Sequence, residues 1–418
     1  MKVFKFGGAS VNSVERIQQM ARIVKEHHQQ PLVIIVSAMG KTTNALEKVA
    51  EAFYAGKKDE ALQLFNVIKQ QHLTTAKYLL VTQFNACLAQ LSDFFTEVEW
   101  LLHDKPVRGF DYYYDQVVCI GELLSTAIVS HYLAETGLAN EWLDVRDIIR
   151  TDSHFRSANI NWGYTTAKTL DAIEAQPGAL YVTQGFIGAT DENESTTLGR
   201  EGSDYTAAIF ANILDAESLT IWKDVEGVMS ADPKAFPDAQ FLAALSFNEV
   251  IEMAYYGAQV IHPKTIKPLQ NKGIPLHVKC FLNSALPGTV ISSKAVKNLP
   301  PIVVVKNNQV LLHLRSQDFS FIGEAAVSRL YTLFSELNIQ PSLIQTGAIS
   351  LQVCLDNRAD KIEQLAAAAS AVFDVQLEKE LSLLTIRHYN AAILTAMTAG
   401  KEQVLVQQTK QTVQVLYK

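Results

Sequence analysis

Residues 1–11 read MKVFKFGGASV, and this stretch decides the class of the fold. Its apolar beginning predicts a buried strand, and its two glycines and serine lead directly into a helical pattern over residues 13–28. Asn12, with Glu15 three positions later, has the spacing of a capping box and is expected to begin that helix. Lys5 interrupts the apolar strand beside the glycine turn, so a cation at this position needs a chemical explanation.

Strand-like and helix-like segments alternate along the first part of the chain. PLVIIVS at 31–37 is a continuous β-branched run, which is typical of a strand buried on both faces of a parallel sheet. Residues 43–105 read almost wholly as helix, and further strand-like runs occupy 179–188 and 218–224. Such alternation implies a mainly parallel sheet with right-handed crossovers. We therefore expect an α/β domain over residues 1–295.

The composition changes around residues 283–301, where three prolines and a glycine predict a linker. Residues 302–378 then read as strand, helix, strand, strand, helix, strand, which is the split ferredoxin-like order. Residues 379–418 read as strand, helical turn, strand, strand. We expect one complete ferredoxin-like unit over 302–378 and a second copy over 379–418 that stops early.

Composition argues against several classes of function. The net charge of −7 speaks against a nucleic-acid partner, which would require a basic surface. No apolar run is expected to reach membrane-spanning length, and residues 1–6 are too short for a signal sequence. The cysteines have no paired spacing and predict buried thiols in a reducing compartment: Cys87, Cys119, Cys280 and Cys354. We therefore expect a soluble cytoplasmic protein without a membrane or nucleic-acid partner.

The glycine turn after the first strand has the chemistry of an anion site. Backbone N–H groups at the carboxyl ends of parallel strands, together with helix N-termini, attract anions. Gly7 and Gly8 would let the backbone approach a phosphate closely, Ser10 would add a hydroxyl donor, and Lys5 a positive charge. The alternative is a tight strand–helix turn with a solvated lysine. Neither the Walker pattern GxxxxGK[ST] nor the dinucleotide pattern GxGxxG occurs.

Four further stretches place polar groups where an α/β sheet binds ligands. SAMGKTTN at 37–44 follows a buried strand. Glu122 stands in the apolar run IGELLS, where a carboxylate needs a cationic partner, although a structural ion pair would also satisfy it. TTLGREGSD at 196–204 carries an arginine suited to bidentate carboxylate recognition. WKDVEGVMSADPK at 222–234 follows a strand and has the character of a nucleotide-holding loop.

Together with GAQVIHPKT at 257–265, these motifs resemble in order and spacing the aspartokinases of the amino-acid-kinase family, over essentially the whole chain. The resemblance implies a three-layer αβα kinase domain with a mainly parallel sheet, followed by an ACT domain and a truncated second ACT unit. It implies ATP-dependent phosphorylation of the β-carboxylate of L-aspartate, the first step toward lysine, threonine, methionine and diaminopimelate. ATP and Mg²⁺ are the implied cofactors, with the metal bridging phosphates, and a homodimer through the ACT domains is the implied assembly.

The resemblance also implies roles for individual residues. Lys5 and Asp204 form the implied catalytic pair, because Lys5 supplies fixed positive charge where the phosphoryl group is transferred. Arg200 is implied to grip a substrate carboxylate and Glu122 to pair with the α-ammonium. The full implied substrate set is Ser37, Thr43, Asn44, Glu122, Arg200 and Ser203. The implied nucleotide set is Lys5, Gly7, Gly8, Ser10, Lys223, Asp224, Met229, Lys234 and Gln259.

Some positions depart from the pattern of many relatives. Many relatives carry threonine at the position of Lys223 and tyrosine at the position of Met229. Many also carry arginine at the position of Lys234 and lysine at the position of Gln259. Lysine in place of arginine keeps the charge but loses the bidentate fork. In the tail, Ser342 stands where lysine-inhibited relatives carry an acidic residue for the effector's ammonium, and Gly347 and Ala348 follow where polar residues are common. The sequence therefore predicts poor lysine binding. An alternative is that the ACT units form a dimer interface and have no other role.

Two other functions remain open at the level of sequence. One is another amino-acid or carbamate kinase, against which the GELLST and TTLGREGSD motifs and the ACT-like tail speak. The other is a catalytically weak amino-acid sensor built on the ACT units. The presence of Lys5, Arg200 and Asp204 argues against such a loss of activity.

Overall fold

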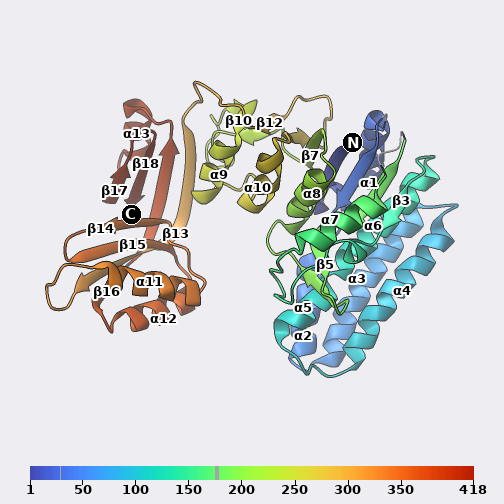
Figure 1. The fold of residues 1–418 in the computed structure, drawn as a ribbon, viewed down its shortest axis with the longest axis horizontal. Helices are drawn as coiled ribbons and strands as arrows, with labels where there is room; N and C mark the ends of the chain where they lie inside the picture. The colour runs from blue at the N-terminus through green and yellow to red at the C-terminus, as the bar shows by residue number, and fades with distance from the viewer. Residues whose placement is uncertain (29, 175–177) are drawn as a thin grey trace. The chain divides into compact units, whose positions relative to one another are not determined.

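The structure is a computed structural model of the chain, and it describes residues 1–28, 30–174 and 178–418 (Figure 1). The chain forms two compact units. Unit 1 comprises Met1–Val228, Leu242–Ile251 and Val260–Val296, and unit 2 comprises Met229–Phe241, Glu252–Gln259 and Lys297–Lys418. The three domain ranges expected from the sequence remain predictions.

An eight-stranded sheet forms the centre of unit 1. Its spatial order is β10 (Ala244–Ser246), β12 (Thr289–Ser292), β11 (Leu276–Cys280), β7 (Ser218–Lys223), β1 (Lys2–Phe6), β2 (Leu32–Val36), β4 (Leu180–Gln184) and β3 (Glu141–Leu143). All neighbours in this sheet run parallel except β11 and β12. The expected mainly parallel sheet is confirmed, and the entirely buried LVIIV of β2 lies inside it.

Helices cover both faces of this sheet. Successive side chains on β1 point to opposite faces and show which helices lie on each. The Phe4 ring lies 5.5 Å from His27 of α1 (Val14–His27), whereas the next residue, Lys5, reaches Asp204 of α8 (Gly202–Ile213). On the α8 side, α10 (Pro263–Lys272) packs against α8, and α7 (Trp162–Ala172) also contacts it. On the α1 side, α6 (Ile120–Glu135) packs against β2, β3 and β4. The result is the expected αβα arrangement.

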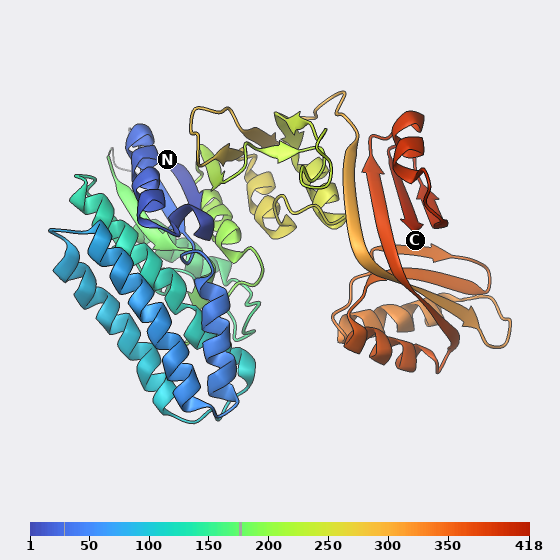
Figure 2. The same ribbon diagram turned by 180° about the vertical axis from the view of Figure 1, so that it is seen from behind.

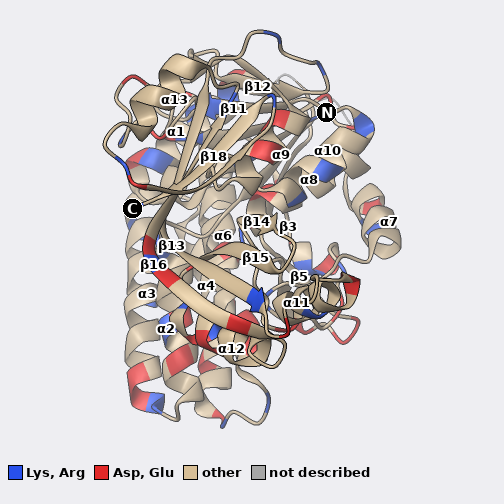
Figure 3. Ribbon diagram, turned by 90° about the vertical axis from the view of Figure 1, so that its left-hand side faces the viewer, with Lys and Arg blue, Asp and Glu red and all other residues tan. Residues whose placement is uncertain are grey.

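Four more helices build outward from α6, and the long pair α3 and α4 lies side by side in both ribbon views (Figures 1 and 2). Acidic and basic residues are interspersed along α2 and α3, as expected for solvated helix faces (Figure 3). These helices are α2 (Thr42–Tyr54), α3 (Lys58–Leu79), α4 (Phe84–His103) and α5 (Phe110–Val118). The smaller elements are η1 (Gly8–Val11), η2 (Val145–Asp147), β5 (Ile187–Ala189), β6 (Ser195–Thr197), β8 (Val228–Met229), β9 (Phe241–Leu242) and α9 (Phe247–Tyr255).

Two sequence expectations in unit 1 need correction. Ser13, not Asn12, caps α1: Ser13 has the extended backbone that an N-cap requires, and its Oγ accepts the Arg16 N–H at 3.3 Å. Asn12 instead has helical angles at the end of η1. The apolar stretch Phe110–Glu135 is long enough by length and composition to cross a membrane, contrary to expectation, but 78% of its most apolar window is buried within the protein. It therefore has the burial of a core helix.

Unit 2 is built on a six-stranded antiparallel sheet. Its order is β14 (Leu343–Thr346), β15 (Ser350–Asp356), β13 (Ile302–Ser316), β16 (Phe373–Arg387), β18 (Thr412–Tyr417) and β17 (Gln403–Gln408). Helices α11 (Glu324–Glu336) and α12 (Ala359–Ala369) cover one face, where Val310, Leu312 and Leu314 pack with Leu330 and Leu365. The order β13, α11, β14, β15, α12, β16 is the expected ferredoxin-like unit.

The partial second copy shares strands with the first. Residues 302–306 of β13 pair with 383–387 of β16, and residues 309–316 pair with 373–381, with a register shift between them. Helix α13 (Ala391–Thr398) packs on the part of the sheet that contains Leu384 and Val413. The boundary expected at 378/379 therefore falls inside a continuous strand.

Candidate active site

A cavity of about 650 Å³ lies in unit 1 at the carboxyl ends of the parallel strands. It is lined by residues that follow β1, β2 and β4, by the start of α8, and by Glu122 of α6. Ten of the residues singled out in the sequence lie on its wall: Lys5, Gly8, Ser37, Thr43, Asn44, Glu122, Arg200, Ser203, Asp204 and Lys223. The structure thus brings together the whole proposed substrate set.

The remaining proposed nucleotide residues are not part of this lining. Gly7, Ser10 and Asp224 belong to unit 1 but do not line the cavity. Met229, Lys234 and Gln259 belong to unit 2. Their assignment to the nucleotide stays a prediction.

Gly8 is required by the packing of two loops against each other. A Cβ on Gly8 would lie 2.5 Å from the Ala38 carbonyl oxygen, and the Gly40 N–H donates to the Gly8 carbonyl at 3.0 Å. The loop after β1 is therefore joined by backbone contacts to the loop after β2. This role differs from the close approach to a phosphate expected from the sequence, because the neighbour that excludes a side chain is protein backbone.

Lys5 and Asp204 form a buried ion pair on the cavity wall. The Lys5 Nζ lies 2.6 Å from the Asp204 Oδ1, and both residues are buried. Burial alone would raise the pKa of Asp204, but the positive charges of Lys5 and Lys223 outweigh burial and lower this pKa below its ordinary value. Asp204 is therefore ionised at neutral pH and holds the Lys5 ammonium in place.

Glu122 is a buried carboxylate whose two oxygens differ in their hydrogen bonding. The Ala38 N–H donates to Oε1 at 3.2 Å, whereas the buried Oε2 has no hydrogen-bond partner among the residues that the structure describes. Burial raises the pKa of Glu122 to about 8, although the Ala38 N–H and Lys5 act in the opposite direction. A carboxylate in this state is stabilised by a cation that enters the cavity.

Two arginines line the cavity, and the sequence pointed to only one of them. Arg200 is exposed and, within the described part of the chain, forms no ion pair. Arg156 lies over the Tyr114 ring at 4.2 Å, and its guanidinium contacts Glu47 at 3.3 Å and Asp111 at 3.5 Å. Arg156 stands in a nondescript loop, so no local signal marked it.

Three residues on the cavity wall have left-handed backbone angles without being glycine. The φ values are +67° at Arg156, +70° at Phe186 and +55° at Glu201. Such conformations cost energy and are typical of functional sites. Glu201 is held in place by a hydrogen bond in which the His262 N–H donates to its Oε2 at 2.9 Å. The wall is thus held in a shape that the local sequence alone would not favour.

Comparison with known proteins identifies the family of the chain. The model of the amino acid kinase family matches residues 1–280. Aspartokinase 2, chloroplastic, of Arabidopsis thaliana is 32% identical over 408 residues, which cover 92% of this chain and 73% of the relative. Lysine-sensitive aspartokinase 3 of Escherichia coli (strain K12) is 30% identical over 397 residues, which cover 92% of this chain and 86% of the relative.

A solved structure has the same fold over the full chain. The crystal structure of E. coli aspartokinase III in complex with aspartate and ADP (R-state) has a TM-score of 0.85 and 26% identity, and the match covers 100% of this chain and 96% of that one. Several other plant relatives, some of them bifunctional, are longer, and the chain spans only 32% to 64% of their length. The chain belongs to the amino acid kinase family, and within it to the aspartokinases.

Proposed function

We propose that this protein is an aspartate kinase, which transfers the γ-phosphoryl group of ATP to the β-carboxylate of L-aspartate and forms 4-phospho-L-aspartate. The observation that carries the proposal is the buried Oε2 of Glu122, which has no hydrogen-bond partner among the described residues and lies in the same cavity as Arg200 and the Lys5 ammonium. This cavity offers an anion for an α-ammonium and cations for two carboxylates. L-Aspartate carries this set of charges.

The chemistry of the step fits the residues present. The β-carboxylate is ionised at neutral pH and attacks the γ-phosphorus directly while the bond to the β,γ-bridging oxygen breaks and ADP leaves, so the step needs no general base. Phosphoryl transfer is catalysed mainly by positioning and by neutralising negative charge. Lys5, held by Asp204 at 2.6 Å, supplies a fixed positive charge that does not have to reorient during the reaction.

ATP and Mg²⁺ would be held by different kinds of ligand. Lys5 and Lys223 line the cavity and would face the phosphates of ATP, and Lys223 also donates to the Val260 carbonyl at 2.7 Å. The described residues contain no group of three His, Cys, Asp or Glu side chains that could hold a metal. Mg²⁺ commonly binds through substrate phosphates and one or two carboxylates, so the nucleotide would bring most of its ligands. When bound, Mg²⁺ neutralises charge on the phosphates.

Assembly and location are further parts of the proposal. A homodimer through the ACT sheet is supported by β14 and β17, which are the two edge strands of that sheet and leave backbone groups open for pairing. Light scattering tests this, and a stable monomer would contradict it. A cytoplasmic location is supported by four buried cysteines, none of which forms a disulfide.

One assay tests the function against its alternatives. ATP-dependent hydroxamate formation is measured with L-aspartate, L-glutamate and carbamate in parallel. We expect turnover with L-aspartate alone. Turnover with glutamate or carbamate would favour another kinase of the family. Binding of amino acids without turnover would favour a sensor.

A further inference from the structure

Asp115 of α5 is a buried carboxylate that holds two separate loops, although its sequence context did not mark it. Its side chain is fully buried. Its Oδ2 accepts the Arg156 N–H at 2.9 Å and the Thr197 N–H at 2.8 Å, and its Oδ1 accepts the Thr197 hydroxyl at 2.7 Å. One carboxylate thus binds two segments that are distant from each other and from α5 in the sequence.

Both segments form the wall of the proposed substrate cavity. Arg156 and Thr197 line it, and Thr197 ends β6 three residues before Arg200. Arg156 has a φ of +67°, a backbone conformation that a residue other than glycine keeps when its surroundings impose it. The bond from the Arg156 N–H to Asp115 is such a constraint, because it fixes the backbone at the strained residue itself.

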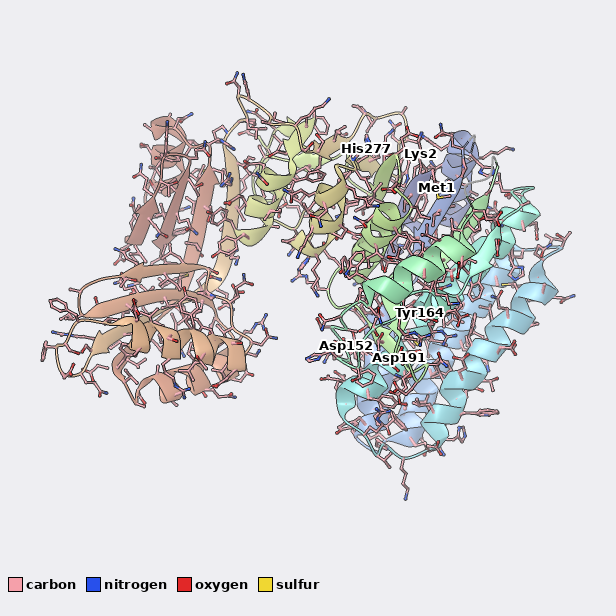
Figure 4. All side chains as sticks on the ribbon, viewed as in Figure 1. Met1, Lys2, Asp152, Tyr164, Asp191 and His277 are labelled. Atoms are coloured by element: carbon pink, nitrogen blue, oxygen red, sulfur yellow. The ribbon has the colours of Figure 1, made fainter. Side chains whose placement is uncertain are left out.

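Neighbouring contacts support the same arrangement. Gln116, the next residue of α5, accepts the Ser195 N–H at 3.1 Å and donates to the Ser195 carbonyl at 2.8 Å. Side chains of α5 therefore take the hydrogen-bonding place of a strand beside β6. The loop that carries Arg156 is closed at its base by Asp152, which is labelled in Figure 4 and whose Oδ1 accepts the Asn159 N–H at 2.9 Å.

We infer that Asp115 is a positioning residue for the amino-acid substrate: it fixes the wall on which Arg156 lies and which presents Arg200 to a carboxylate of the substrate. The inference rests on the proposed function, because it takes aspartate as the ligand of this wall. Asp115 acts through the two backbone segments and does not line the cavity itself.

Hydrogen bonding, not charge, is what Asp115 contributes. Burial raises the pKa of Asp115 to about 6, although the bonds from Arg156 and Thr197 act in the opposite direction. An asparagine oxygen can accept the same two N–H groups, and the Thr197 hydroxyl can rotate to accept from the amide. Asp115→Asn therefore keeps the geometry without the charge, whereas Asp115→Glu keeps the charge but displaces the carboxylate by one methylene.

The experiment compares these two variants with Asp115→Ala and with Asp93→Ala, which removes an exposed carboxylate on α4. We expect Asp115→Ala and Asp115→Glu to raise the KM for aspartate by about tenfold or more, as for other misplaced binding groups, with a smaller change in the KM for ATP. Asp115→Asn should recover most of the loss, and Asp93→Ala should resemble the wild type. If Asp115→Ala does not fold, the comparison of Asp115→Asn with Asp115→Glu still tests the inference.

A second readout does not depend on turnover. Hydrogen–deuterium exchange at the amides of Arg156 and Thr197 should be faster in Asp115→Glu than in Asp115→Asn, even if the wild-type protein phosphorylates no aspartate. A wild-type KM for aspartate in Asp115→Ala would overturn the inference. So would an asparagine variant that is as impaired as the glutamate variant, or one whose two amides exchange as fast.

Discussion

The Lys5 ammonium and the Asp204 carboxylate lie 2.6 Å apart, and together they join β1 to the first turn of α8. Both side chains are almost completely removed from solvent. Because each neutralises the other, the central strand can carry a lysine at its carboxyl end within an otherwise apolar sheet. This explains the interruption of the apolar run at residue 5.

Replacing Lys5 by alanine removes the fixed charge proposed to lie nearest the transferred phosphoryl group. We expect kcat to fall by about 10²-fold or more, which is the scale for losing one electrostatic contact in the transition state. The matched control is Lys2→Ala on the same strand, because Lys2 is more exposed and reaches Glu217 only at 4.0 Å. Near-normal turnover of Lys5→Ala, in protein shown by circular dichroism to be folded, would remove the catalytic assignment.

Replacing Arg200 by alanine should raise the KM for aspartate with a smaller change in the KM for ATP. The reason is that Arg200 is exposed on the cavity wall and, in the described residues, is not committed to an ion pair. Arg200→Lys should be intermediate, since it keeps the charge and loses the bidentate fork. Steady-state kinetics with each substrate varied in turn checks this. Equal damage to both KM values would place Arg200 at the phosphates.

Glu122 should make both stability and aspartate binding depend on pH. Its pKa in the folded protein, about 8, lies above the ordinary value of 4.5, so the folded state binds more protons between these values. The stability of the ligand-free protein should therefore fall as pH rises from about 5 to 8. Glu122→Gln cannot titrate, so it should show a smaller fall in Tm over this range.

Aspartate binding should change with pH in the opposite direction. The ionised form of Glu122 is the one that pairs with an ammonium, so the KM of the wild type should decrease as pH approaches 8. Glu122→Gln should have a raised KM that changes little with pH. Thermal melts and kinetics across this range measure both effects. Parallel pH profiles for the two proteins would show that Glu122 does not titrate as described.

Lysine should inhibit this protein weakly or not at all. Ser342 is already in contact with a cation, because the Lys306 Nζ lies 3.1 Å from its Oγ. Ser342 also lines a cavity of about 550 Å³ in unit 2, and none of the described residues on its wall is charged. An effector ammonium would therefore lose its hydration without gaining an opposing charge. Titration of lysine, threonine and methionine in the kinase assay tests this, and strong inhibition by lysine would show that the effector pocket lies elsewhere.

The sequence predicted the parts of the site that depend on local pattern. The glycine turn beside Lys5 and the arginine in TTLGREGSD could be found because each motif directly follows or precedes a regular element. Arg156 and Asp115 could not, because their importance arises from contacts between α5, β6 and a loop that are far apart in the chain. A single sequence contains no signal for such long-range contacts.

The fold shows the same division. The period of apolar residues predicted β2 and α1 closely, but Ser13 replaced Asn12 as the cap, since the backbone angles at the end of η1 depend on the packing of the turn. The continuity of β16 across residue 378 was also missed. Glu380 has a φ of +62°, so the strand is irregular at this point although it continues to Arg387.

The strands shared by the two halves of the unit 2 sheet have a consequence for the order of events during synthesis. Ile302 of β13 pairs with Arg387 of β16, and Arg387 in turn pairs with Thr412 of β18. The ribosome must therefore release residues 412–417 before the sheet can close, whereas contacts within the N-terminal kinase segments can form earlier. Until then β16 has an open edge, and we expect nascent chains that stall before residue 412 to depend on chaperones to avoid aggregation.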